Sequence, residues 1–348
     1  MSFPSLSFEE TLLEKVVLKE NCMGCGACVI VCPFGCLEYL EQKPRLVKKC
    51  EVCGICPRVC PRYEWSRSDL EKLVFGRKRK PNEDFGIYQR LVLAQTTDKD
   101  TMLSCQDGGV VTTLVTFALK NGIIDGALLS GLNTDKPFYP APVLVTTPKE
   151  VLKCSGTRYT YSPNLLAIQE AFKQKRQDLA FVGTPCQIQA IRKMEAAKLG
   201  RYTGRIKFTV GLMCTESFTY EGLMEEQIQQ TLGINLHDVK KMNIKGKVNV
   251  TTNSGDVKTI SLAEAKQHTR KSCLPCTDFS AELADISAGG LGLSGWTLTI
   301  IRTEIGEELF KDAEKAGLIK TRPIEEEKNA FNLLIKLSRK KRKTAGSS

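Results

Sequence analysis

The chain has 348 residues, with 42% hydrophobic and 26% charged side chains and a formal net charge of +11. This composition is that of an ordinary soluble globular protein, and the length predicts two or three folded units. Cysteine is the exception, with 15 residues, an odd number that leaves at least one thiol unpaired. The acidic Glu9 and Glu10 stand where a secretion signal needs a basic end and an apolar run. We therefore exclude a secreted disulfide scaffold and expect reduced, metal-binding cysteines.

No segment approaches the roughly 18 uninterrupted apolar residues of a membrane span. We expect a cytoplasmic protein that attaches to the inner face of a membrane only through partner subunits. Much of the positive charge lies in two runs, at 77–80 and 339–343. We interpret both as solvated surface, with docking of an acidic partner or anionic lipid as the functional alternative. A nucleic-acid binder would interleave aromatic residues with these charges, so we expect no nucleic acid partner.

Two cysteine runs with the spacing C-x2-C-x2-C-x3-C, each followed by proline, lie near the start of the chain. The runs are Cys22, Cys25, Cys28 and Cys32, then Cys50, Cys53, Cys56 and Cys60. This spacing is typical of bacterial ferredoxins with two 4Fe-4S clusters, in which the fourth cysteine of each run ligates the other cluster. The expected ligand sets are Cys22, Cys25, Cys28 and Cys60 for one cluster, and Cys50, Cys53, Cys56 and Cys32 for the other.

The residues between these cysteines favour the same interpretation. Gly24, Gly26 and Gly54 allow the backbone to wrap closely at positive φ, and their N–H groups are available to cluster sulfurs. The alternative is zinc, but zinc ribbons use two C-x2-C pairs and not two runs of four. Cys36 fits neither run, and we interpret it as a spare buried thiol.

The remainder of the chain predicts an α/β domain with a largely parallel or mixed sheet. Short apolar runs predict strands at 91–96, 127–130, 143–146, 179–182, 206–213 and 298–302. Helical periodicity lies at 110–120, 163–175, 186–198, 220–232, 307–316 and about 325–337, and a β-hairpin is expected at 248–262. The expected layout is a ferredoxin-like domain at 1–65, a linker at 66–85, a larger domain at 86–325, and a C-terminal helix with a basic tail at 326–348.

Ligands of α/β sheets bind beyond the carboxyl ends of the strands, and a glycine pair lies at such a position. Gly108 and Gly109 open a predicted helix, where backbone N–H groups and the helix dipole favour a phosphate. Paired glycines are also common in turns, so this motif alone is weak.

Four further cysteines favour a third metal site. Cys186 and Cys214 follow predicted strands, and Cys273 and Cys276 form a C-x2-C pair. The alternative is that Cys186 and Cys214 are ordinary buried thiols. Two other cysteines compete as ligands, namely Cys105 and Cys154.

With these motifs in order, the larger domain resembles the beta subunits of coenzyme F420 hydrogenases and dehydrogenases over about 86–310. The matching stretches are QDGGVVT at 106–112, GTRY at 156–159, SPN at 162–164, FVGTPCQ at 181–187, CTESF at 214–218, CLPCTD at 273–278, ADIS at 284–287, GG at 289–290 and GW at 295–296. With the two-cluster domain in front, the whole chain resembles the electron-input subunit of the methanogen F420 dehydrogenase, an archaeal complex related to respiratory complex I.

The resemblance implies FAD and an additional 4Fe-4S cluster in the larger domain. It implies FAD contacts at Gly108, Gly109, Thr112, Thr157, Tyr159, Ser162 and Asn164. It implies ligands of the third cluster at Cys186, Cys214, Cys273 and Cys276. It also implies that Asp278, Asp285 and Gly290 line the same cavity. The role of the basic tail is left open.

The activity implied is oxidation of reduced F420 by FAD, with electrons passing through the third cluster and then the two N-terminal clusters. The acceptor would be a membrane-bound, methanophenazine-reducing complex of partner subunits, or ferredoxin. The catalytic residue stays unidentified, because the chain has only His237 and His268 and flavin hydride transfer needs no histidine. The alternatives are a non-catalytic iron–sulfur relay subunit and an F420-linked subunit of another reductase.

Overall fold

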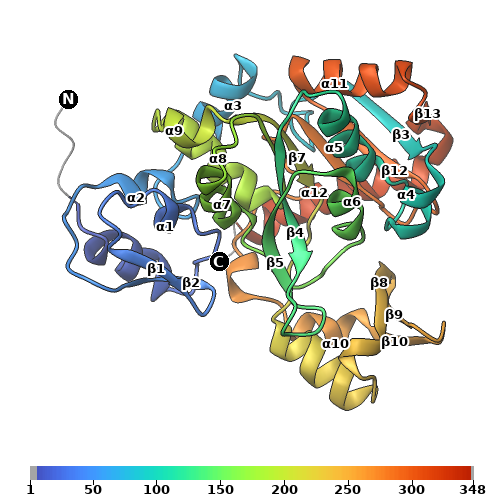
Figure 1. The fold of residues 1–348 in the computed structure, drawn as a ribbon, viewed down its shortest axis with the longest axis horizontal. Coiled ribbons are helices and arrows are strands. Elements are labelled where there is room, and N and C mark those ends of the chain that lie inside the picture. The colour runs from blue at the N-terminus through green and yellow to red at the C-terminus, as the bar shows by residue number, and fades with distance from the viewer. Residues whose placement is uncertain (1–5, 346–348) are drawn as a thin grey trace.

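The computed structural model describes residues 6–345, and the chain runs from a small cysteine-rich part into a larger α/β part (Figure 1). A three-stranded sheet projects from the larger part, beside the helices drawn in yellow. None of the helices within residues 6–345 combines the length and the apolar character that crossing a lipid bilayer requires.

The N-terminal part consists of short elements wrapped around its cysteines. These are η1 (Glu9–Val17), α1 (Ala27–Ile30), β1 (Leu37–Leu40), β2 (Lys43–Leu46) and α2 (Ile55–Val59). Gly26 and Gly54 precede α1 and α2 with φ of 80° and 66°, a conformation that favours glycine. The two glycines therefore let each cysteine run turn into a short helix, and their positive φ is the conformation that the sequence predicts.

An eight-stranded mixed sheet forms the centre of the larger part. In chain order its strands are β3 (Arg90–Thr96), β4 (Gly126–Leu132), β5 (Pro140–Val145), β6 (Leu179–Gly183), β7 (Ile206–Leu212), β11 (Ile286–Gly289), β12 (Thr297–Ile301) and β13 (Ile319–Pro323). The spatial order is β13-β3-β12-β11-β7-β6-β4-β5. The contiguous strands β11, β7, β6 and β4 are parallel, and the outer pairs are antiparallel. The predicted α/β fold with a mixed sheet is confirmed, and β11 and β13 are additions to the predicted strands.

Helices cover both faces of this sheet. They are α4 (Lys99–Ser104), α5 (Val110–Lys120), α6 (Pro148–Lys153), η2 (Asn164–Ala167), α7 (Ile168–Lys173), α8 (Pro185–Ala196), α9 (Gly200–Thr203) and α11 (Glu304–Lys315). Ala127 and Leu129 of β4 face the core beneath α5 and α11, whereas Leu128 faces the core beneath α8. This alternation is the period-two pattern of a strand buried on both faces.

The N-terminal part shares a hydrophobic core with the α8 face of the sheet. Ala27, Ile30 and Val59 pack in the same cluster as Ile188 and Ile191 of α8. The helix α3 (Arg67–Phe75), which begins at an N-cap bond from the Asp69 N–H to Ser66 Oγ, also contributes Leu70 to that cluster. The segment expected as a linker is therefore partly helical and packed.

The projecting sheet contains the predicted hairpin and one further strand. Its strands are β8 (Val239–Lys245), β9 (Lys247–Thr252) and β10 (Val257–Ser261), in the order β10-β9-β8. Around them lie η3 (Glu221–Thr231), η4 (Leu236–Asp238), α10 (Leu262–Gln267) and η5 (Lys271–Cys273). The predicted hairpin corresponds to β9 and β10. The strand β8 is not predicted, because its lysines interrupt the apolar run that indicates a strand.

The C-terminal segment differs from the expected helix and solvated tail. After η6 (Ile324–Glu327), α12 (Lys328–Ala345) continues through the whole basic run, and 346–348 lie outside the described residues. Arg342 is half-buried because it pairs at 2.5 Å with Glu282, whose side chain is 2% exposed. Arg79 of the other basic run pairs with the same carboxylate at 2.9 Å. The interpretation of both runs as solvated surface is therefore wrong for these arginines.

Candidate functional site

The first thiol group combines Cys22, Cys25 and Cys28 with Cys60 from the second run. Burial raises the pKa of Cys28 well above its ordinary value, and the nearby thiols of Cys25, Cys22 and Cys60 raise it further. Burial likewise raises the pKa of Cys60 to about 11. The structure thus places the fourth cysteine of one run beside the first three of the other.

The second thiol group combines Cys50, Cys53 and Cys56 with Cys32. Burial raises the pKa of Cys56 to about 12, and the thiols of the other three act on it in the same direction. These four cysteines line one small hollow, whose other walls include the apolar side chains of Phe8, Phe34, Leu37 and Leu46. Cys53 is the only exposed cysteine within the described residues. The second group therefore lies nearer to solvent than the first.

The third thiol group forms at the carboxyl edge of the large sheet. Cys186 lies in the first turn of α8, Cys214 follows β7, and Cys273 and Cys276 lie on the loop at η5. Burial raises the pKa of Cys186 to about 11, with Cys276 and Cys273 also acting on it, and Cys214 is near all three. The structure thus brings together four cysteines that are distant in sequence.

The remaining cysteines lie in other surroundings. Cys105 is buried near Lys241 and Asp107, and Cys154 lies near Arg158. Cys36 donates to the Lys49 carbonyl oxygen at 3.2 Å, while its own N–H donates to Cys32 Sγ. The structure does not place Cys105 or Cys154 in the third group.

The first and third thiol groups adjoin each other across the boundary between the two parts. The thiol of Cys186 acts electrostatically on Cys25. Arg62, two residues after Cys60, donates to the carbonyl oxygens of Ser272 at 2.8 Å and Pro275 at 3.1 Å on the third-group loop. These bonds fix the third group beside the first. The second group adjoins the first, since the thiol of Cys56 acts electrostatically on Cys28.

The donors of the three thiol groups suit iron–sulfur clusters, because each group combines four cysteine sulfurs. Within residues 6–345, no three His, Cys, Asp or Glu side chains are close enough together to bind one metal ion. Backbone N–H groups donate to Cys50 Sγ from Phe8 at 3.5 Å and Val52 at 3.4 Å, and to Cys273 Sγ from Ser217 at 3.4 Å. Such N–H donors and an apolar shell are the features by which proteins stabilise cluster sulfurs and tune their potentials.

The glycine turn before α5 packs closely against β3 and β12. The Gly108 N–H donates to Thr297 Oγ1 at 3.0 Å, and a Cβ at Gly108 would lie 2.4 Å from the Ala94 carbonyl oxygen. Gly109 has φ of 72° at the N-cap of α5, and Thr112 is half-buried in the first turn. Gly290 lies against this turn, since a Cβ there would meet Asp107 Oδ2 at 2.1 Å.

The loop at 154–159 lies beside the glycine turn and α4. Ser155 Oγ donates to the Ser104 carbonyl oxygen at 3.2 Å. Thr157, two residues further along the loop, is half-buried. Tyr159 accepts from the Ile244 N–H at 3.0 Å, and burial raises the pKa of Tyr159 to about 12. The structure thus brings together two of the stretches that the resemblance assigns to FAD.

Positive charge at this turn comes from residues that the sequence analysis missed. Lys241 of β8 donates to the Cys105 carbonyl oxygen at 2.9 Å. Burial raises the pKa of Asp107, while Lys245 and Lys241 act to lower it. The sequence offered only a weak signal, since both lysines belong to a strand that its apolar pattern does not predict.

Four of the residues expected to contact FAD or line its cavity form hydrogen bonds with other groups of the protein. Ser162 Oγ donates to Asn164 Oδ1 at 2.6 Å, and Asn164 Nδ2 donates to the Val182 carbonyl oxygen at 2.8 Å. Asp285 accepts from Thr209 N, Thr209 Oγ1, Thr303 Oγ1 and Arg192 Nη2. Asp278 accepts from the Glu282 N–H, and burial raises the pKa of Asp278. These bonds give all four residues a part in holding the loops around the site.

The fold, together with the first and second thiol groups, defines a 4Fe-4S ferredoxin-like domain joined to an α/β domain. Comparisons with protein families agree. A 4Fe-4S binding domain matches residues 15–38. The N-terminal and C-terminal domains of the coenzyme F420 hydrogenase/dehydrogenase beta subunit match residues 91–169 and 176–327. The chain belongs to the family of coenzyme F420 hydrogenase/dehydrogenase beta subunits, and it is an F420-linked protein with iron–sulfur binding.

Individual relatives place the match over most of the chain. The coenzyme F420 hydrogenase beta chain of Methanosarcina barkeri is 39% identical, over 74% of this chain and 89% of that protein. One component of the F(420)H(2) dehydrogenase of Methanosarcina mazei is 30% identical, over 95% of this chain and 92% of that protein. Among solved structures, the F420-reducing [NiFe] hydrogenase complex from Methanosarcina barkeri contains a chain that matches with a TM-score of 0.73 and 36% identity, over 77% of this chain and 94% of that one.

Proposed function

We propose that this chain oxidises reduced F420 with a bound FAD and delivers the electrons singly through three 4Fe-4S clusters to a partner. The observation that carries the proposal is the succession of three thiol groups, with Cys186 of the third beside Cys25 of the first. The dehydrogenase component that matches 95% of this chain supports the same activity. The succession gives the electrons a route from the sheet edge to the N-terminal part.

The proposed ligand sets follow the three thiol groups. They are Cys22, Cys25, Cys28 and Cys60 for the first cluster; Cys50, Cys53, Cys56 and Cys32 for the second; and Cys186, Cys214, Cys273 and Cys276 for the third. When bound, FAD supplies the conversion between two-electron hydride exchange and one-electron transfer. The turn at Gly108 and Gly109, at the start of α5, would hold its phosphate, with Lys241 and Lys245 supplying positive charge.

The outlet is proposed at the second thiol group. Cys53 is exposed there, and the surrounding surface presents Phe34, Val47 and Val52 with exposed fractions of 48%, 48% and 37%. Exposed apolar residues around a buried redox group are typical of a contact surface for another protein. The partner would be a subunit of a membrane-bound, methanophenazine-reducing complex, or a ferredoxin.

The test is anaerobic purification with full iron, sulfide and FAD content, followed by assay with reduced F420 and a one-electron dye. We expect F420 oxidation coupled to dye reduction. A fully loaded preparation that turns over no F420 contradicts the proposal. A protein that retains iron but binds no flavin is instead a relay subunit. If reduced F420 reduces the protein only when another reductase is present, the protein is a subunit of that enzyme.

A further inference from the structure

The C-terminal helix α12 reaches the third thiol group with one lysine. Lys341 Nζ donates to the carbonyl oxygen of Cys273 at 3.4 Å. The thiols of Cys276, Cys214 and Cys273 interact electrostatically with Lys341. Three thiols of the group therefore lie within electrostatic reach of this one ammonium.

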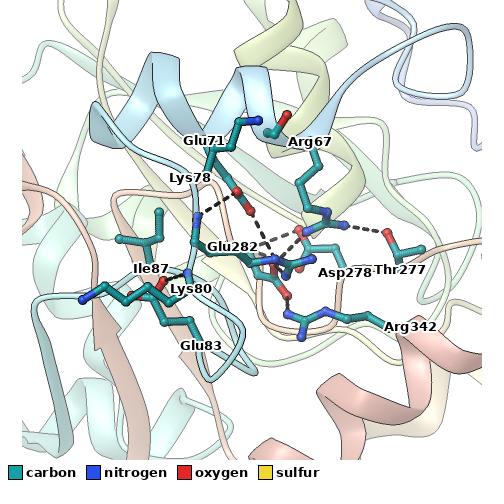
Figure 2. Close-up of polar contacts among 12 residues, drawn as sticks. Arg67, Glu71, Lys78, Lys80, Glu83, Ile87, Thr277, Asp278, Glu282 and Arg342 are labelled. Carbon is teal, nitrogen blue, oxygen red and sulfur yellow. Dashed lines mark hydrogen bonds and ion pairs between the residues drawn. The ribbon is translucent and has the colours of Figure 1, made fainter.

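Ion pairs on both sides of Lys341 hold α12 in place. Arg339 donates to the two carboxylate oxygens of Asp84 at 2.9 and 2.7 Å. Arg342 pairs with Glu282 at 2.5 Å, and Figure 2 shows Arg342 from α12 and Arg67 from α3 both reaching this carboxylate. Upstream, Leu334 packs in the core with Leu298 and Ile300 of β12. Because these contacts anchor α12, Lys341 stays close to the thiols of the third group.

Other charged groups face the third group from other elements. Arg62, from the N-terminal part, acts on Cys186 and bonds the carbonyl oxygens of the loop. Glu216, two residues after Cys214, also acts on Lys341 and lies 3.9 Å from Lys266. Lys341 interacts electrostatically with Cys214, Cys273 and Cys276, and Arg67 of α3 also faces the group, where it interacts with Cys276 and bonds to Thr277.

We infer that Lys341 favours the reduced form of the third cluster and thereby raises its midpoint potential. This inference rests on the proposed function. A 4Fe-4S cluster held by four thiolates is anionic and gains one more negative charge on accepting an electron from the flavin, with no bond made or broken. A fixed cation in a partly buried site stabilises the more negative state by Coulomb attraction. The positive charge of Lys341 therefore favours transfer of an electron from the flavin to the third cluster.

The test is a redox titration of the full chain, followed by electron paramagnetic resonance, on the anaerobically loaded protein. The signal of the third cluster is identified by its loss in Cys276→Ser. We expect Lys341→Gln to shift the reduction equilibrium of this cluster about tenfold toward the oxidised form, which is about 59 mV for one electron. Lys341→Arg should keep the potential near that of the unmodified protein. Lys336→Gln, an exposed lysine on the same helix, is the matched control and should shift nothing.

An unchanged potential in Lys341→Gln, or an equal shift in Lys336→Gln, overturns the inference and leaves the proposed function intact. If Lys341→Gln assembles no third cluster, Lys341→Arg decides: assembly with arginine supports a role of charge, and failure with arginine overturns it. Absence of a third cluster from the unmodified protein overturns both this inference and the proposed electron route.

Discussion

Lys193 donates a hydrogen bond of 2.7 Å from Nζ to the carbonyl oxygen of Cys60, and two further bonds to the carbonyl oxygens of Tyr63 and Glu64. Lys193 lies on α8, the helix that carries Cys186 in its first turn. Seven helical residues span about 10 Å, so one rigid element sets the separation of the first and third thiol groups. Burial lowers the pKa of Lys193 to about 8, which leaves the ammonium as the main form at neutral pH.

Replacing Lys193 by methionine should loosen the N-terminal part. The change leaves three carbonyl oxygens without this donor at a side chain that is 6% exposed. We expect a loss of about 3 kcal/mol in the free energy of unfolding, since each unsatisfied buried group costs about 1–3 kcal/mol. Urea denaturation measures the loss, and amide hydrogen exchange should show it at 60–64.

The matched control is Lys173→Met, because Lys173 is a largely exposed lysine on α7 with one surface pair. We expect a change within about 0.5 kcal/mol there. Equal stability of the Lys193 and Lys173 variants would mean that water replaces the lost donor at no cost.

Glu282→Gln should be among the most destabilising changes to a single carboxylate. Arg67, Arg79 and Arg342 all pair with Glu282, which is 2% exposed. Removing the negative charge leaves buried guanidinium groups uncompensated, so we expect a loss of about 3–5 kcal/mol in the free energy of unfolding. Glu41→Gln breaks an exposed pair with Arg45 and should cost less than about 1 kcal/mol. Chemical denaturation of the two variants side by side checks this, and similar losses would contradict a buried network.

Gly108→Ala should remove FAD from the protein. The added methyl group would lie 2.4 Å from the Ala94 carbonyl oxygen and 2.6 Å from the Thr297 N–H, so the backbone of the turn must shift. We expect loss of the flavin absorbance and a stability cost of about 1–3 kcal/mol. Gly200→Ala is the control, since nothing lies within 4 Å of the added Cβ. Retention of a full flavin complement by Gly108→Ala would remove the turn from the flavin site.

Cys56→Ser and Cys22→Ser should each block onward electron transfer and leave flavin reduction by reduced F420 intact. Each variant loses a ligand of one N-terminal cluster, so iron should fall from about twelve to about eight atoms per chain. Cys36→Ser removes a buried thiol outside the three groups and should keep all the iron. Stopped-flow absorbance separates flavin reduction from dye reduction. Loss of flavin reduction in a folded Cys22 variant would show that the proposed order of electron carriers is wrong.

Local features of the fold could be predicted from the sequence. The spacing of the eight cysteines in the two runs predicts a ferredoxin-like domain, because chain geometry within about ten residues fixes which three thiols of a run face one cluster. Apolar runs predict the six strands β3, β4, β5, β6, β7 and β12, since strands buried on both faces are almost continuously apolar. Where short or lysine-rich strands occur, at β8, β11 and β13, this signal is absent and the strands were not predicted.

The sequence by itself determined the cysteine runs, the α/β alternation and the family motifs, because each depends on residues that lie close together along the chain. Only the tertiary structure decided that Lys193 bonds to Cys60, that Lys341 reaches Cys273, and that the basic end of the chain is a packed helix. The physical reason is that these contacts join residues separated by 68 to 133 positions. Such contacts depend on how helices pack on the sheet, and no spacing rule along the chain encodes that packing.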